Sequence, residues 1–467
     1  MTAQTILPAN SVSDTAFNSN SCRFDGTGAY MSKTPGSDGD AQKMTTSIWF
    51  KRGVLGRDIR WFEMGDLMLY SGTNIIGFAN RAFDFDVYTE SNFLMDTAAW
   101  YHIVWSVDTT QSTAANRVKI YVNGVLLTSA NGLHADTSYM DQNANLECNQ
   151  QEVHRVGAAS NNANDKFDGY MSEFVHIDGA QLAPTSFGES DSDSGIWVPI
   201  EVSGLTFGTN GFYLDFKSSG NLGNDANGGT DLTETGLAAI DQSTDTPTNN
   251  FATFKSNHPA IANTAFSEGN LQFSSDGNVT TQAPASSSIA VSTGKWYAEF
   301  KVIAESTRSG SYSYVGVAGT ALWVSAANNS YYIGNQADTI GYNGNAAVYS
   351  NGNEVDGSET NYANGNIVGV AADFTNSKIY FSVNGTYINS GDPAGAANGY
   401  DIPATAEGFY YFAVSVFGQN ATWQANFGSP PYAISSSNRD ANDHGNFEYA
   451  VPSGFFALNT KNLGEHG

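Results

Sequence analysis

The sequence predicts an all-β protein made of two antiparallel β-sandwiches that a loop-rich segment joins. Three observations lead to this fold class. Glycine occurs 48 times and proline only 12 times in 467 residues, and no amphipathic helical pattern extends beyond about ten residues. Short runs of β-branched and aromatic residues recur instead, separated by clusters of Asn, Gly, Asp and Ser. A strand–turn–strand pattern that ends in an Asn-Gly hairpin occurs twice, about 260 residues apart.

The two hairpins are the clearest predicted elements. VKIYVNGVLL at 118–127 alternates apolar and polar residues up to its Asn-Gly pair, and KIYFSVNGTYI at 378–388 is the second copy. Asn-Gly supplies the two positive-φ positions of a type I′ turn. IVWSVD at 103–108 and IVGVAAD at 367–373 precede the hairpins as further strands. This repeat is too long for a solenoid and indicates two sandwiches of related topology.

The composition predicts three parts. We expect the first sandwich at 1–185, a loop-rich connecting segment at 186–256 and the second sandwich at 257–467. The connecting segment is rich in Ser, Asp, Gly and Asn, but Trp197 and Phe212 are among the aromatic residues that interrupt it. A pure linker lacks such anchors, so one or two strands and long packed loops are expected there.

The net charge excludes classes of partner. The chain has 20 Lys and Arg against 46 Asp and Glu, a formal charge of −26. Nucleic-acid binding needs a field of Lys and Arg that releases phosphate counterions, and anionic lipid attracts the same residues. We therefore expect no nucleic acid among the partners. Aromatic residues make up 13% of the chain, far more than a disordered acidic chain contains.

Two further features concern the compartment. The longest apolar runs are well short of the roughly 20 residues that span a bilayer, and the N-terminal residues have neither the basic nor the apolar region of a secretory signal. We therefore expect no membrane insertion and no secretion signal. Cys22 and Cys148 are the only cysteines. The sequence favours two unpaired, half-buried thiols and leaves one disulfide open as the alternative.

Four strand motifs follow one another in the first half. They are SCRFDGTGAYMS (21–32), TSIWFKRG (46–53), WYHIVWSVD (100–108) and HRVGAASNNANDKFDGYMSEFVHIDGAQL (154–182). In this order they resemble the laminin-G and pentraxin-like branch of the concanavalin A-like lectin sandwiches. The resemblance extends over about 170 residues and implies a jelly-roll-type sandwich.

The second half carries another ordered set of motifs. They are GKWYAEFKV (294–302), VGVAGT (315–320), GYNGNAAVYSNG (341–352), GNIVGVAADFTNSKIYFSVNGTYINSG (365–391) and GFYYFAVSVFGQNATWQANFG (408–428). This set resembles a SPRY domain, which is itself a concanavalin-like sandwich. The resemblance implies that variable loops over one end of the sandwich form the partner site.

The combination of the two domains resembles proteins of tailed phages, particularly those of aquatic bacteria, of the cyanophage type. It implies a virion protein that assembles in the host cytoplasm and is exposed on the particle surface. The expected role is that of a tail fibre or receptor-binding protein. Its expected partners are other virion proteins, a host cell-surface glycan or receptor, and further copies of the chain, which form a trimer if the protein sits on fibres. A capsid decoration or head-fibre protein and an exopolysaccharide depolymerase are the alternatives, because fold does not dictate function.

One strand-like run, AFDFDVYTE at 82–90, carries acids at alternating positions. Asp84, Asp86 and Glu90 are predicted on one face of a strand. Glucanases of the lectin superfamily carry Glu-x-Asp-x-x-Glu, whereas here the first residue is Asp and the last acid comes later. Carboxylates two residues apart are separated by roughly 6.5–7 Å, against about 5–5.5 Å in a retaining glycosidase. We expect a solvated strand face and no enzyme.

Other catalytic signatures are missing from the sequence. HExxH, GxSxG, Walker A and GxGxxG do not occur in the context that their chemistry requires. The seven histidines are isolated from one another. His102 and His154 lie in strand patterns, which favours structural roles over roles as ligands or bases.

Loops of the second half combine aromatic and amide side chains. Sugar recognition needs flat aromatic faces for the apolar side of a ring and polar side chains for its hydroxyls. With the SPRY resemblance, this pattern predicts a recognition surface. Its candidate residues are Tyr312, Asn328, Asn329, Tyr331, Tyr332, Asn343 and Tyr349. The alternative is that about half of these aromatic residues lie in the core, as we expect for Trp323 and Tyr342.

Calcium is the one candidate cofactor. The laminin-G and pentraxin resemblance implies that loop oxygens could bind it, and the candidates are Asp141, Asn143, Asn145 and Asp165. Ca²⁺ takes six to eight oxygen ligands. The first three candidates are spaced like the start of an EF-hand loop, but the Gly and terminal Glu of that loop do not follow. The alternative is that these residues form turns.

Overall fold

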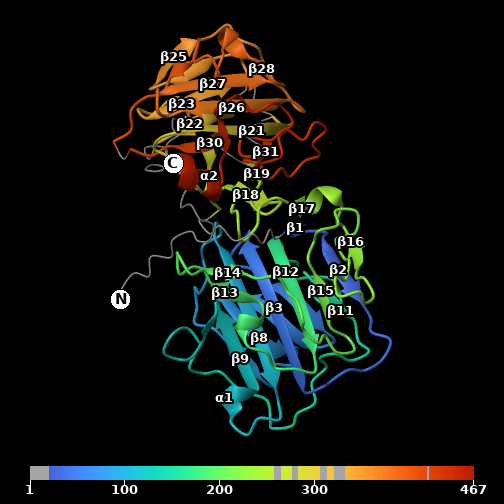
Figure 1. Cartoon of the computed structure of the whole chain (residues 1–467). Helices are drawn as coiled ribbons and strands as arrows, with labels where there is room; N and C mark the ends of the chain where they lie inside the picture. Colours follow the sequence, from blue (N-terminus) through green and yellow to red (C-terminus); the bar gives the residue numbers. More distant parts are fainter. Residues whose placement is uncertain are drawn as a thin grey trace. The chain divides into compact units, whose positions relative to one another are not determined.

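The computed structural model describes residues 20–256, 264–275, 282–305, 313–319, 332–406, 408–417 and 420–467. It divides the chain into two compact units, Met1–Asn250 and Phe251–Gly467. Each unit consists of two main, largely antiparallel sheets (Figure 1). The predicted fold class, an all-β chain with two sandwiches, is confirmed.

The first sheet of the first unit has β3 and β12 at its centre. Its strand order is β10 (Val125–Leu126), β9 (Val118–Val122), β8 (Trp100–Asp108), β3 (Lys43–Arg52), β12 (Asp168–Asp178), β1 (Ser21–Asp25) and β17 (Gln242–Ser243). A further strand, β15 (Phe212–Leu214), pairs with β12. The predicted hairpin at 118–127 forms β9 and β10, and the short helix α1 (Ala114–Arg117) precedes it.

The second sheet of the first unit is built mostly from short strands. Its order is β16 (Thr233–Thr235), β2 (Tyr30–Lys33), β11 (His154–Val156), β4 (Ile59–Met64), β5 (Leu67–Gly72), β6 (Ile75–Asn80) and β7 (Asp86–Tyr88). The hairpin of β13 (Gly188–Ser190) and β14 (Trp197–Pro199) is a separate two-stranded sheet.

The inner faces of these sheets enclose an aromatic core. The ring centroid of Trp61 lies 5.1 Å from that of Phe50 and 5.7 Å from that of Trp105. These three side chains are fully buried and come from β4, β3 and β8. Burial of such large rings supplies much of the hydrophobic free energy of a fold. The core therefore ties the two sheets together.

Residues 186–250, part of the expected connecting segment, belong to the first unit. Their strands β15, β16 and β17 pair with β12, β2 and β1. Two ion pairs hold the end of this stretch, Arg23–Asp241 at 2.8 Å and Lys51–Asp245 at 2.7 Å. Lys51 and Asp245 are almost completely buried. Residues 186–250 are thus an integral part of the first sandwich.

The second unit repeats the two-sheet arrangement. Its larger sheet has the order β18 (Thr264–Ser267), β19 (Gln272–Ser275), β31 (Thr422–Asn426), β21 (Lys295–Ala304), β26 (Ile367–Asp373), β27 (Lys378–Val383) and β28 (Thr386–Tyr387), with β29 (Tyr400–Asp401) on β27 and β32 (Phe456–Ala457) parallel to β21. Its smaller sheet has the order β20 (Gln282–Ser286), β30 (Tyr411–Phe417), β22 (Ser313–Ala318), β23 (Thr339–Asn343), β24 (Val348–Ser350) and β25 (Asn353–Asp356). The helix α2 (Thr460–His466) ends the chain.

The structure bears on two expectations, the state of the two cysteines and the presence of membrane-spanning helices. Cys22 and Cys148 are free thiols, as the sequence favours, but both are fully buried rather than half-buried. Burial raises the pKa of each thiol, so neither is a reactive thiolate. Among the described residues, no helix has the length and apolar character needed to cross a membrane.

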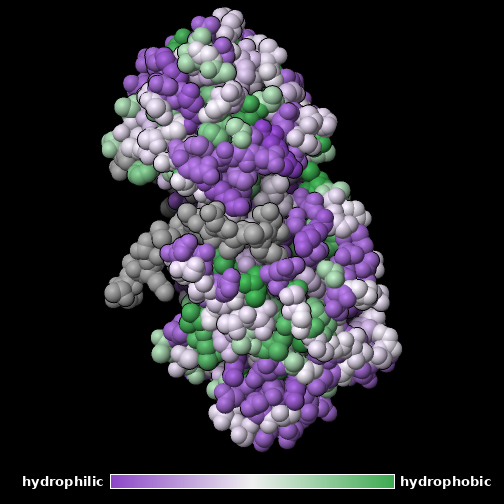
Figure 2. All heavy atoms as spheres, viewed as in Figure 1, coloured by the Kyte–Doolittle hydropathy of each residue, from purple (hydrophilic) through white to green (hydrophobic). Residues whose placement is uncertain are grey.

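On the viewed face, Figure 2 shows largely hydrophilic or neutral surfaces on both units and apolar side chains gathered over the first sheet of the first unit. An apolar layer does cover the outer side of this sheet. Val104, Val175 and Ile177 pack there against Phe187 and Tyr213. This layer explains why β8 and β12 are buried on both faces instead of alternating.

Candidate functional site

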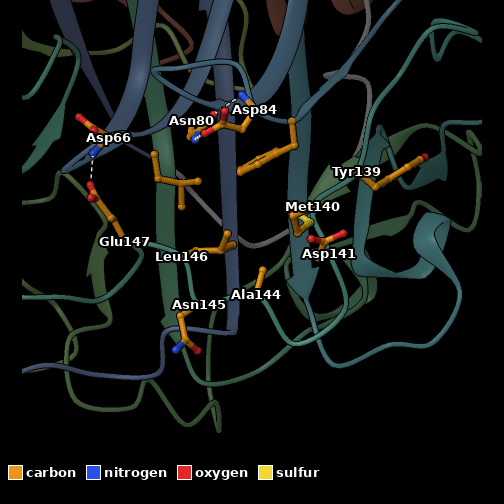
Figure 3. A pocket seen from close by; sticks show the side chains of 12 residues that line it. Asp66, Asn80, Asp84, Tyr139, Met140, Asp141, Ala144, Asn145, Leu146 and Glu147 are labelled. Atoms are coloured by element: carbon orange, nitrogen blue, oxygen red, sulfur yellow. Dashed lines mark hydrogen bonds between the residues drawn. The ribbon is translucent and has the colours of Figure 1, made fainter.

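A pocket of about 400 Å³ opens at one edge of the second sheet of the first unit (Figure 3). Three chain segments form it: the turn between β4 and β5, the stretch that follows β6, and a loop at 139–147. The lining residues are Asp66, Leu67, Asn80, Asp84, Phe85, Tyr139, Met140, Asp141, Ala144, Asn145, Leu146 and Glu147. We call this cavity the acidic pocket.

Hydrogen bonds between the segments hold the walls of the acidic pocket. The backbone N–H of Asp66 donates to the carboxylate of Glu147, which joins the β4–β5 turn to the loop. The side chain of Asn80 donates to the carboxylate of Asp84 at 2.9 Å and accepts from its backbone N–H at 2.9 Å. Arg117 donates to the backbone carbonyl of Met140 at 2.7 Å. The pocket is therefore preformed.

The acidic pocket has an apolar floor and a polar rim. Phe85, Met140 and Leu146 are buried, while Asp141 and Asn145 are exposed. Carboxylate and amide groups hydrogen-bond hydroxyls, and an apolar floor accepts the C–H face of a sugar ring. The arrangement suits a small polyhydroxylated ligand.

The structure does not assemble the four calcium candidates into one site. Asp141 and Asn145 line the acidic pocket, and Asn143 between them has a positive φ of 62° and donates its backbone N–H to Thr109, as a turn residue does. Asp165 pairs instead with Arg60 at 3.1 Å.

The separation of Asp165 follows from the length of a strand. Its partner Arg60 lies near the start of β4, whereas Asp66 of the pocket follows the end of β4, six residues later. This corresponds to roughly 20 Å at the rise of an extended strand. Within the described ranges, no group of three or more His, Cys, Asp and Glu side chains is arranged to hold a metal ion. The four candidates therefore do not form one calcium site.

The acidic run at 82–90 differs from the single strand face predicted for it. Only Asp86–Tyr88 form β7. Phe83 has a φ of 56°, which breaks the extended conformation, so that Asp84 lies in the wall of the acidic pocket. Both carboxylate oxygens of Asp86 accept from the hydroxyl of Tyr70 at 2.9 Å, and burial raises the pKa of Asp86 to about 6.

Four of the seven predicted ligand residues of the second unit, Tyr312, Asn328, Asn329 and Tyr331, lie outside the described residues, as does Trp323. Asn343 is buried, and its side-chain oxygen accepts from the backbone of Asn345 and Ala347, both at 3.0 Å. It therefore shapes a turn. Tyr342, expected in the core, is fully buried.

Tyr332 and Tyr349 lie together on the outer face of the smaller sheet. The ring of Tyr332 stacks on Tyr314 with centroids 4.4 Å apart, and Tyr349 packs edge-on to both. The hydroxyl of Tyr349 donates to Glu354 at 2.6 Å, and this bond raises the pKa of Tyr349 to about 12. Tyr332 and Tyr349 are half-buried, so part of each ring remains available to a ligand.

The sequence did not predict the acidic pocket, although it singled out two of its residues as calcium candidates. Asp141 and Asn145 stand out because they share a loop rich in acids and amides. Asp66 and Asn80 give no local signal, because only the pairing of β4 with β5 and of β5 with β6 brings them to the same edge. Phe85 and Leu146 look like ordinary core residues in the sequence.

Comparison with known proteins agrees with this fold. The sequence profile Laminin_G_3, described as the concanavalin A-like lectin/glucanases superfamily, matches residues 25–182, which confirms the resemblance predicted for the first half. Among curated proteins, none is significantly similar to the chain.

Solved structures similar to the chain include SPRY domains. The SPRY domain of human HERC1 is 15% identical, with 33% of this chain and 87% of that chain covered and a TM-score of 0.26. The TRIM65 PSpry domain is 14% identical, with 38% and 91% covered and a TM-score of 0.28. Stonustoxin is 14% identical, with 38% and 27% covered and a TM-score of 0.29.

Proposed function

We propose that the chain is a virion protein of the tail-fibre or receptor-binding type that recognises a host cell-surface glycan. The acidic pocket is the observation that carries the proposal. Its volume, about 400 Å³, falls in the range of small-ligand sites. A lectin-type sandwich with such a pocket is suited to adhesion.

The chemistry of the pocket supports a sugar as ligand. A pyranose ring would lie with its C–H face on Phe85 and Leu146, while its hydroxyls donate to the carboxylates of Asp84 and Asp141. The amide of Asn145 both donates and accepts, so it can discriminate the orientation of a hydroxyl. A flat hydrophobic partner would leave these polar groups without hydrogen bonds, which is costly.

Glycan binding by the purified chain tests this proposal. Because Asp141 and Asn145 are exposed, the double variant Asp141→Ala, Asn145→Ala should fold normally and lose binding to glycans of the host surface by about tenfold or more. Asp443→Asn removes an equally exposed carboxylate from the second unit and should bind like the wild type. Unchanged binding by the double variant would contradict the proposal.

The place of the chain in the particle separates attachment from capsid decoration. An attachment protein sits at the tail tip or on fibres in few copies, whereas a decoration protein covers the capsid in many. Labelling intact particles with an antibody against the chain distinguishes the two. Label confined to the capsid would favour the decoration role.

We infer that the chain binds glycans without cleaving them. Burial raises the pKa of Asp86 to about 6, in the range of a general acid, but the hydroxyl of Tyr70 contacts both of its oxygens. Incubation with host exopolysaccharide should therefore release no reducing ends. Product formed by the wild type and lost in Asp86→Asn would instead support a depolymerase.

We also propose that copies of the chain associate, as a trimer if the chain sits on fibres. A charge of −26 on each copy opposes association, and salt screens this repulsion. Light scattering should therefore report a larger oligomeric fraction at high salt than at low salt. A monomer under both conditions would contradict the proposal.

A further inference from the structure

We propose that the second unit holds a separate binding pocket for a neutral saccharide, built where the C-terminal segment meets the Asn384-Gly385 hairpin. The cavity has a volume of about 390 Å³. Its lining residues are Tyr297, Ser382, Asn384, Gly385, Thr386, Tyr387, Tyr449 and Ala450. We call it the tyrosine pocket. It lies in a different unit from the acidic pocket and differs from it in charge.

Three tyrosines form the walls of the tyrosine pocket. Tyr297 comes from β21 and Tyr387 from β28. Tyr449 comes from the C-terminal segment that follows β31. Tyr387 and Tyr449 are half-buried, so their rings are partly open. Tyr297 is buried behind them, so the rings of Tyr387 and Tyr449 are the ones that offer flat faces to a ligand.

The hairpin is shaped to receive the ring of Tyr449. Gly385 has a φ of +81°, and a Cβ at this position would lie 2.5 Å from a ring carbon of Tyr449. Any other residue would therefore push the ring away from the turn. Glycine serves here both the type I′ turn and the close approach of an aromatic wall.

A buried carboxylate fixes the wall that carries Tyr449. The side chain of Glu299 accepts from the backbone N–H of Tyr449 at 2.8 Å and of Glu448 at 3.0 Å. The amide of Asn426 donates to Glu299 at 3.2 Å and to the backbone carbonyl of Asn446 at 2.9 Å. The three bonds to Tyr449, Glu448 and Asn446 attach the C-terminal segment to the sheet, and the Asn426–Glu299 bond holds the two side chains that make them. The pocket is thus preorganised rather than formed by a loose tail.

Hydrophobic contacts support the same attachment. Phe447 packs edge-on to Tyr297 with centroids 5.2 Å apart, and Phe455 and Ala457 belong to the same buried cluster. The C-terminal segment therefore packs on the outer face of the larger sheet. The tyrosine pocket lies where the edge of this segment meets β27 and β28.

The uncharged lining of the tyrosine pocket favours a neutral ligand. None of the eight lining residues is ionisable at neutral pH, although the chain carries 46 acids. Glu299 lies behind the hydroxyl of Tyr297, which donates to it at 3.2 Å, and backbone donors occupy it from the other side. An anion would meet no cation in the lining, and a metal ion would meet no lining carboxylate. Rings, hydroxyls and an amide suit a neutral sugar.

Calorimetry of the full chain with neutral hexasaccharides, namely cellohexaose, maltohexaose, mannohexaose and fully N-acetylated chitohexaose, tests the proposal. We expect at least one of them to bind and the variant Tyr449→Ala to weaken its binding by about tenfold or more. Thr386→Val removes one hydroxyl from an exposed position and should weaken binding without a change in thermal stability, which covers the case that Tyr449→Ala unfolds.

A matched variant separates the two pockets. Tyr139→Ala changes the acidic pocket and the core contacts of Tyr139 in the first unit but removes no lining residue of the tyrosine pocket, so it should leave binding of the neutral hexasaccharide unchanged. Loss of binding in Tyr139→Ala with full binding in Tyr449→Ala and Thr386→Val would assign the sugar to the acidic pocket and overturn this inference. Absence of binding by all four hexasaccharides would overturn it as well.

Discussion

The pKa values of three buried histidines, His102, His154 and His176, depend strongly on their surroundings. His102 lies against the ring of Trp49 with centroids 4.6 Å apart, accepts from Trp197 at 2.9 Å and shares a 2.8 Å hydrogen bond with Ser47. The structural role expected for His102 from its strand pattern agrees with these contacts. Burial lowers the pKa of His102 to about 3.

The same effect makes the fold sensitive to acid. Burial also lowers the pKa of His154 to about 3 and that of His176 well below its usual value. Histidines of the unfolded chain titrate near pH 6.5. Below this pH they bind protons in the unfolded state, whereas the buried histidines of the folded state stay neutral. The free energy of unfolding should therefore fall by several kcal/mol as the pH drops from about 6.5 toward 3.

Urea denaturation at pH 7, 6 and 5 measures this loss. Asp86, Glu173 and Glu299, whose pKa values burial raises, bind protons in the folded state and oppose part of this loss. In the variant His154→Leu, the free energy of unfolding should depend less steeply on pH, by the equivalent of about one bound proton. A free energy of unfolding that stays constant between pH 6.5 and 5 would contradict the assignment.

Glu173 predicts the opposite dependence at higher pH. It has a φ of 47° at an irregularity in β12, and its carboxyl accepts from the hydroxyl of Tyr213. Burial raises the pKa of Glu173 to about 8. A group whose pKa is raised by folding stabilises the protein at low pH, and this contribution disappears as the pH rises from about 4.5 through 8.

Glu173→Gln has no ionisable group at this position, so it should lack the part of the decline that Glu173 causes. We expect the melting temperature of the wild type to fall between pH 6 and 9 relative to that of Glu173→Gln. Scanning calorimetry of both proteins measures the difference. Parallel curves over this range would rule out Glu173 as the cause.

At the scale of elements, the two Asn-Gly hairpins share the same closing contacts. The backbone N–H of Asn123 donates to the carbonyl of His102 at 2.9 Å, and its side-chain oxygen accepts from the N–H of His102 at 2.8 Å. Asn384 makes the same pair of bonds to Ile367, both at 2.9 Å. Each asparagine thus occupies a positive-φ position and also closes the start of the neighbouring strand.

Substitutions at these asparagines separate the two roles. Asn384→Gly keeps the backbone conformation and loses the side-chain bond, so it should cost about 1 kcal/mol. Asn384→Ala loses the bond and also strains the turn, so its cost should be about 2 kcal/mol. Chemical denaturation ranks these variants, with Asn384→Asp, which keeps the acceptor, closest to the wild type. An alanine variant as stable as the glycine variant would contradict the strained turn.

The hairpins also mark how far the sequence predicts elements. Alternation and an Asn-Gly pair are local signals, so β9 and β27 could be placed from the sequence alone. The strands β15, β16 and β17 have two or three residues each, too few for a period to be seen. They are strands only because distant residues of the first unit pair with them. The acidic pocket was not predicted for the same reason, since Asp66 and Asn80 reach it through strand pairing.

At the scale of the whole molecule, the important boundary lies at residues 250 and 251. The first unit includes the stretch with Asp241 and Asp245. Asp245 accepts from the ammonium of Lys51 at 2.7 Å and from the indole of Trp100 at 2.9 Å. Because Lys51 and Asp245 are buried, separating them would leave a charge in an apolar environment. Removal of one partner of such a pair costs about 3–5 kcal/mol.

Fragments of the chain test this boundary. A fragment that covers 1–250 should unfold cooperatively, whereas one that covers 1–185 should be several kcal/mol less stable or aggregate. The shorter fragment lacks β15 to β17 and leaves Lys51 without Asp245. Amide dispersion in NMR spectra and resistance to proteolysis measure the difference. In the longer fragment, Asp245→Ala should reproduce about 3–5 kcal/mol of the loss, whereas equal stability of the two fragments would show that the sandwich closes without this stretch.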